Sequence, residues 1–131
     1  MRPERAATLA RAAAVARAGE RLDRLSLYPE PVRREHVRIV VAPLAFRLPW
    51  LRQFDGYTAW GLILLRFEAE DDDLLTHELC HVWQLQHQPL RMPLSYLLSG
   101  YAANPYEAEA RAAVEATRGQ ATTTVAAPTS A

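Results

Sequence analysis

Residues 77–81 read His-Glu-Leu-Cys-His, the segment of this sequence with the clearest chemical meaning. Two histidines four positions apart share one face of a helix, so both imidazoles can reach a single ion. Glu78 follows the first histidine and can hydrogen-bond a metal-bound water without being a ligand. Zinc lowers the pKa of such a water to about 7, and a carboxylate can take its proton as the water attacks a carbonyl. The pattern predicts zinc at His77 and His81, with Glu78 as general base.

A catalytic zinc usually takes a third protein ligand, and His87 is the first candidate. It lies six residues after His81, a spacing used when an intervening glycine turns the chain back. Gln84 stands in place of that glycine and favours a continuous helix. His87 would then be rotated by about 240° from His81 and lie roughly 9 Å further along the axis. We therefore expect His87 to miss the metal.

Two glutamates at the start of the last predicted helix are the other candidates. Asn104 is a favourable N-cap residue, Pro105 suits the first helical position, and Glu107 falls at the third. This arrangement predicts a capping box, in which Glu107 reaches back to the backbone N–H of Asn104. Glu109 has no such task and faces roughly the opposite side. We favour Glu109 as the third metal ligand and keep Glu107 as the alternative.

The elements that position these residues follow from the spacing of apolar residues and from glycine and proline. Helices are predicted at 4–25, 74–87, 93–102 and 104–118, and strands at 37–41 and 57–66. Gly61 interrupts the second strand, where a glycine often marks a bulge or a close backbone approach. The acidic run 70–73 is expected to be a solvated loop and helix cap. The prediction is an α+β fold, with a small sheet packed on the histidine helix and a second helix that carries a glutamate.

Length and composition limit the remaining function classes. The 131 residues indicate one domain over 1–118 and a Thr/Ala/Ser/Pro-rich disordered tail over 119–131. Fifteen arginines balance fifteen acidic residues, which argues against a nucleic-acid or membrane partner. The single cysteine, Cys80, is expected to be a buried core thiol. No secretory signal and no apolar stretch of roughly 20 residues is evident, so we expect a cytoplasmic protein.

Two segments together carry a family resemblance. Residues 77–84, His-Glu-Leu-Cys-His-Val-Trp-Gln, are followed at 104–110 by Asn-Pro-Tyr-Glu-Ala-Glu-Ala. This combination resembles the compact gluzincin-type zinc metallopeptidases, which share a minimal zincin-like core. The resemblance covers about residues 57–116. The first segment is common to the whole zincin class, and the second is more discriminating.

The resemblance implies a zinc peptidase with a defined ligand set. His77, His81 and Glu109 would hold zinc, and Glu78 would act as base. It also implies that strand 57–66 lies along the cleft as an edge, where an extended peptide or protein substrate can pair through its main chain. The chain is short, which is compatible with recognition of that substrate through a homo-oligomer or a partner protein.

Two further roles in a peptidase have candidate residues. In larger gluzincins a carboxylate four residues past the ligand glutamate orients the first histidine, but here that position is Ala113, or Arg111 if Glu107 is the ligand. Support for His77 must come from elsewhere; the candidates are Asp55, Asp71–Asp73 and Glu115. Tyr101 and Tyr106 precede the third ligand and could donate to the developing oxyanion, although both could simply pack in the core. We take Tyr101 as the catalytic candidate.

Two other functions are compatible with the same sequence. The chain could be a catalytically silent zinc-binding or peptide-binding module, although a purely structural site has no need of Glu78. It could also be an interaction protein without metal, in which the Ala/Arg-rich helix 4–25 binds a partner. Zinc content and the effect of changing Glu78 separate these alternatives.

Overall fold

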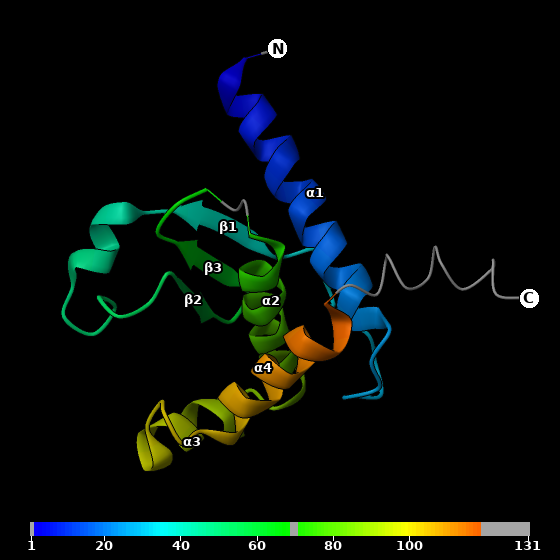
Figure 1. The fold of residues 1–131 in the computed structure, drawn as a ribbon, viewed down its shortest axis with the longest axis vertical. Helices are drawn as coiled ribbons and strands as arrows, with labels where there is room; N and C mark the ends of the chain where they lie inside the picture. Colours follow the sequence, from blue (N-terminus) through cyan, green and yellow to red (C-terminus); the bar gives the residue numbers. More distant parts are fainter. Residues whose placement is uncertain (1, 69–70, 119–131) are drawn as a thin grey trace, which may run out of the picture.

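The computed structural model describes residues 2–68 and 71–118 and has the predicted α+β architecture, with four helices and a small mixed sheet. The predicted tail 119–131 lies outside the described residues. In chain order the elements are α1 (Pro3–Asp23), β1 (Arg38–Val41), the 3-10 helix η1 (Pro43–Arg47), β2 (Gly56–Ala59), β3 (Leu62–Leu65), α2 (Asp72–His87), α3 (Arg91–Ser99) and α4 (Pro105–Thr117). Helix α2 is central, because α1, α4 and β2 all contact it (Figure 1).

The sheet has the strand order β1-β3-β2, with β1 parallel and β2 antiparallel to β3. The prediction of one strand over 57–66 is therefore wrong, since this segment contains the turn of a hairpin. Trp60 adopts a left-handed φ of 54° in that turn. A side chain at Gly61 would bring its first carbon 2.9 Å from the carbonyl oxygen of His36. Gly61 thus marks the turn and a close approach to the preceding loop.

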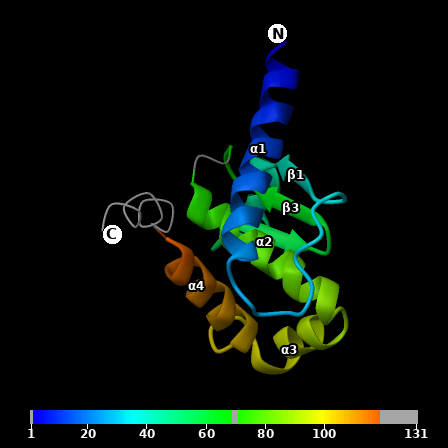
Figure 2. The same ribbon diagram turned by 90° about the vertical axis from the view of Figure 1, so that its right-hand side faces the viewer.

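The core lies between α1, α2 and the inner face of the sheet, and Figure 2 shows α1 running across the sheet beside α2. Alanines at positions 14 and 18 of α1 let this helix approach α2 closely. Cys80 of α2 is buried in this core as predicted, Trp83 is buried beside it, and burial raises the pKa of the Cys80 thiol. Within 2–68 and 71–118, no helix combines the length and apolar character needed to cross a membrane.

Charged residues fix the N-terminal end of α2. The Asp71 carboxylate accepts a hydrogen bond from the backbone N–H of Asp73 at 2.9 Å, which confirms the predicted cap. Asp73 in turn pairs with Arg21 of α1 at 2.9 Å and with Arg118 after α4 at 2.8 Å. The three helices are thereby connected at the end of α2 that leads into the first histidine.

The start of α4 is fixed by Asn104, which is 2% exposed. Its side-chain oxygen accepts from the backbone N–H of Tyr106 at 2.8 Å, as expected of an N-cap. Its amide nitrogen donates to Ser95 Oγ of α3 at 3.0 Å. One side chain therefore caps α4 and joins it to α3.

We expect Asn104→Ala to lower the free energy of unfolding by about 1–3 kcal/mol, because it removes the cap and leaves Ser95 without its donor. Urea denaturation of the purified variants measures this change. Asn104→Ser is the matched variant, since its neutral hydroxyl keeps an acceptor for the Tyr106 N–H and should lose less. Equal stability of the parent and the alanine variant would contradict this dual role.

Candidate metal centre

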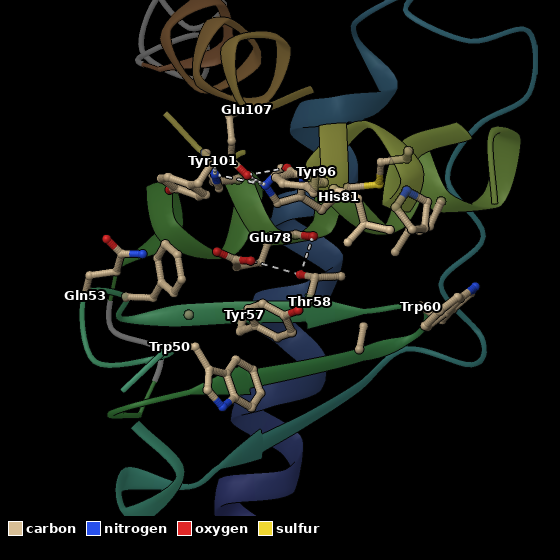
Figure 3. Close-up of a pocket in the computed structure, with 18 residues that line it drawn as sticks. Trp50, Gln53, Tyr57, Thr58, Trp60, Glu78, His81, Tyr96, Tyr101 and Glu107 are labelled. Carbon is tan, nitrogen blue, oxygen red and sulfur yellow. Dashed lines mark hydrogen bonds and ion pairs between the residues drawn. The ribbon is translucent and has the colours of Figure 1, made fainter. Parts of the chain in front are cut away.

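The imidazoles of His77 and His81 both face the carboxylate of Glu107 on α4 (Figure 3). His77 Nε2 lies 3.1 Å from Glu107 Oε1, and His81 Nε2 lies 2.8 Å from Glu107 Oε2. The two imidazole Nε2 atoms are 3.2 Å apart. Two residues one helical turn apart on α2 and one on α4 thus form a single cluster.

The cluster fits a metal ion. One ligand atom from each of the three residues lies within 4.8 Å of the others. Tetrahedral zinc, 2.0–2.1 Å from its ligands, sets donor atoms about 3.3 Å apart, so the observed spacing needs little adjustment. Two imidazoles and one carboxylate are a donor set that zinc accepts, and three protein ligands leave a fourth position for water or substrate.

Glu107, and not the expected Glu109, is the glutamate that meets the histidines. The predicted capping box does not form, because the backbone N–H of Asn104 donates to the carbonyl oxygen of Tyr101 at 3.2 Å. The Glu107 side chain is therefore free to turn toward α2. Glu109 Oε1 instead accepts from the Tyr28 hydroxyl at 2.7 Å.

The Glu107 carboxylate and the His81 imidazole each favour the charged form of the other, against the effect of burial. Burial alone would raise the pKa of the Glu107 carboxyl, but hydrogen bonds from the two imidazoles and Tyr96 hold it well below its usual range. Burial alone would lower the pKa of His81, but Glu107 and Glu78 outweigh it and raise that pKa. A carboxylate this deeply buried requires positive charge beside it, which a protonated imidazole or a cation supplies.

Glu78 is buried beside the cluster, in the space between α2 and β2. The Thr58 hydroxyl lies 2.9 Å from Glu78 Oε1 and 3.1 Å from the Glu78 carbonyl oxygen, so it can donate to either. A side chain at Gly56 would bring its first carbon 3.1 Å from Glu78 Oε2. Gly56 is thus the glycine that lets β2 approach the site. Burial raises the pKa of Glu78.

Among the described residues, three tyrosines line the cleft: Tyr57 of β2, Tyr96 of α3 and Tyr101 after α3. Tyr101 lines the cleft, where its ring packs 4.7 Å from Phe54 and lies 5.7 Å from the Arg111 guanidinium. Tyr106, the other tyrosine considered from the sequence, donates to Gln88 and does not line this cleft.

Tyr96 is a site residue that the sequence analysis missed. Its hydroxyl donates to Glu107 Oε2 at 2.5 Å. The available signal was its spacing, because Met92 lies one helical turn earlier on the same face and is buried. This spacing indicates that Tyr96 faces the interior of the protein, on the side of α3 from which its hydroxyl reaches Glu107.

None of the carboxylates considered as support for His77, all of which are described residues, contacts it through a hydrogen bond or ion pair. Asp71 caps α2, and the others pair with arginines: Asp55 with Arg66 at 3.6 Å, Asp72 with Arg17 at 3.1 Å, Asp73 with Arg21 at 2.9 Å, and Glu115 with Arg118 at 2.7 Å. His87 is away from the cluster, as expected: its Nδ1 lies 3.1 Å from the Trp83 carbonyl oxygen, to which it can donate, and its ring stacks on Tyr28.

A cavity of about 570 Å³ opens beside the cluster, between β2 and α3. Its walls are mainly aromatic and aliphatic: Trp50, Phe54, Tyr57, Trp60, Met92 and Leu97. Among the described residues that line it, the ionisable groups other than tyrosine are Glu78 and the three members of the cluster. The site is therefore the polar floor of a largely apolar cleft.

No protein-family model, curated protein or solved structure matches this chain. The resemblance to gluzincins stays a prediction, and a function for this chain can be inferred only from the residues of the site.

Changing each glutamate to glutamine tests which one binds metal. Glu107→Gln should weaken zinc binding by more than the roughly 10–100-fold that loss of an outer partner costs, because it replaces the anionic ligand itself. Glu109→Gln should bind nearly as the parent does, since its amide oxygen still accepts the same hydrogen bonds. Competition with a chromophoric chelator measures both affinities. A greater loss in the Glu109 variant would reverse the assignment.

Proposed function

We propose that this protein is a zinc-dependent hydrolase of the metallopeptidase type. The observation that carries the proposal is the convergence of His77, His81 and Glu107 within 4.8 Å, with a buried carboxylate beside them in a cleft. Bound zinc would polarise a carbonyl and lower the pKa of a coordinated water to about 7. Peptide-bond hydrolysis is the reaction that this combination of ligands and base serves.

Glu78 would act as the general base. It takes a proton from the attacking water and passes it to the leaving amine, so one carboxylate serves both proton transfers. The Thr58 hydroxyl can donate to Oε1 of Glu78, and Gly56 leaves room for β2 to pack against the Glu78 side chain. A site that only held metal would gain nothing from an additional buried carboxylate, which favours turnover over a silent module.

Tyr101 remains the candidate donor for the developing oxyanion. Its ring lines the cleft, and the Arg111 guanidinium beside it makes the surroundings favourable for negative charge. Tyr96 donates to Glu107 at 2.5 Å, and Tyr101 also interacts with that carboxylate, so the Arg111 guanidinium beside Tyr101 is the feature that favours Tyr101.

The substrate would lie along β2. The Arg66 N–H bonds to the Asp55 carbonyl, and alternation along an antiparallel pair then turns the backbone groups of Gly56 and Thr58 away from β3. An extended peptide can pair with these groups at the edge of the sheet. The predicted edge over 57–66 thus corresponds to β2 alone, since β3 is the central strand.

Glu78→Gln tests the reaction directly. It should retain about one zinc per chain and lose about 100-fold to 10,000-fold in hydrolysis of a peptide substrate, because the amide cannot accept the proton. Glu115→Gln on the surface of α4 is the control and should hydrolyse as the parent does. Equal activity of the Glu78 variant would exclude this mechanism, and a parent that holds zinc but cleaves nothing would be a binding module.

The cleft lining predicts preference for neutral, apolar substrates. A fluorogenic peptide with leucine and phenylalanine around the cleavage point should have kcat/KM at least about tenfold above one with aspartates there, since burying one such side chain is worth about 1.5–3 kcal/mol. Trp60→Ala should reduce this preference, and Leu98→Ala, exposed outside the cleft, should not. Equal rates for both peptides would contradict the prediction.

A further inference from the structure

Glu109 belongs to a chain of hydrogen bonds that is partly buried at Tyr28 and Glu109, fully buried at Gln84, and ends on a histidine of the metal cluster. His81 Nδ1 lies 2.7 Å from Gln84 Oε1, one turn further along α2. Gln84 Nε2 lies 3.0 Å from Glu109 Oε1, which also accepts from the Tyr28 hydroxyl. The order along the chain of bonds is Tyr28, Glu109, Gln84 and His81.

The orientation of the Gln84 amide is determined by its partners. Its nitrogen faces two acceptors, the Glu109 carboxylate and the Tyr106 carbonyl oxygen at 2.9 Å. That end must therefore be the NH₂ group, and the amide oxygen must face His81. An amide oxygen can only accept, so His81 Nδ1 carries a proton whether or not Nε2 does. A metal therefore takes the place of the proton on His81 Nε2, the nitrogen that faces Glu107.

The burial of Gln84 indicates that its side chain has a role beyond packing. Gln84 is 0% exposed and stands in a helix whose other buried residues are largely apolar. A buried amide costs stability unless both donors and its acceptor are paired, whereas leucine would fill similar space without that requirement. Packing of α2 alone therefore does not explain a glutamine here, and its contact with the metal cluster does.

The chain of bonds also involves the segment between α1 and β1. Tyr28 of this segment stacks on His87 and lies edge-on to Trp83. The Trp83 indole N–H donates to the carbonyl oxygen of Glu30 at 2.8 Å. Packing against Trp83 and His87 of α2 thus holds the Tyr28 ring in place. Its hydroxyl is therefore a fixed donor to Glu109.

We propose that Glu109 and Tyr28 are positioning residues for the metal centre, and that they act through Gln84 to fix the His81 ring and its proton. This inference rests on the proposed metal site and assigns a role to the second glutamate of the Asn104–Ala110 segment. Glu107 meets the histidines directly, and Glu109 holds the group that orients one of them.

The test is zinc affinity in a set of variants of the full chain, measured by chelator competition. Glu109→Leu and Gln84→Leu should each weaken zinc binding by about 10–100-fold, the usual cost of losing an outer hydrogen-bond partner of a ligand. Glu109→Gln should stay within about threefold of the parent, because its oxygen can accept both bonds. Tyr28→Phe should weaken binding, and the matched Tyr106→Phe, whose hydroxyl serves Gln88, should not.

Two further measurements separate positioning from a merely structural role. Nitrogen-15 NMR of the histidine rings in the zinc-loaded parent should show His81 protonated at Nδ1, and Glu109→Leu should disturb that signal. Urea denaturation of the metal-free variants reports stability alone. A folded Glu109→Leu protein with parental zinc affinity and an unchanged His81 signal would overturn the positioning role only. A parent that binds no zinc would overturn the proposed function and this inference with it.

Discussion

The buried carboxylate of Glu107 sets the strongest constraint on this structure. A charge with 3% exposure is costly unless opposite charge and hydrogen-bond donors surround it, and α2 supplies both through His77 and His81. Tyr96 adds a donor from α3. The three helices must therefore keep the angle at which these groups meet. A metal cation would satisfy the same carboxylate, so the fold and the proposed ligand set impose the same geometry.

The sheet packs against α2 beside the same cluster. β2 approaches α2 where Gly56 has no side chain and where Thr58 can donate to Glu78. The Thr58 hydroxyl offsets part of the cost of burying Glu78, and a side chain at position 56 would crowd the Glu78 carboxylate. The β2 edge of the sheet consequently lies beside the cluster, and a polypeptide paired with that edge would pass Glu78 and the two histidines.

The sequence predicts the features that depend on neighbouring residues. The shared face of His77 and His81, the Asn104 cap and the burial of Cys80 all follow from helical geometry and local chemistry. Contacts that depend on how helices and loops pack against one another cannot be predicted from neighbouring residues. The Asn104 N–H finds the Tyr101 carbonyl in the preceding turn, which removes the reason to assign Glu107 to a capping box.

Glu107 and Glu109 of α4 are not alternatives for one position, because each reaches a different group on α2. Residues two apart on a helix point about 200° from each other, so a helix that crosses α2 can direct them to opposite flanks of the contact. Glu107 reaches the imidazoles on one flank, and Glu109 reaches Gln84 on the other. Starting α4 one residue earlier or later would rotate both by about 100° and break both contacts together. The cap at Asn104 therefore fixes the positions of Glu107 and Glu109 together.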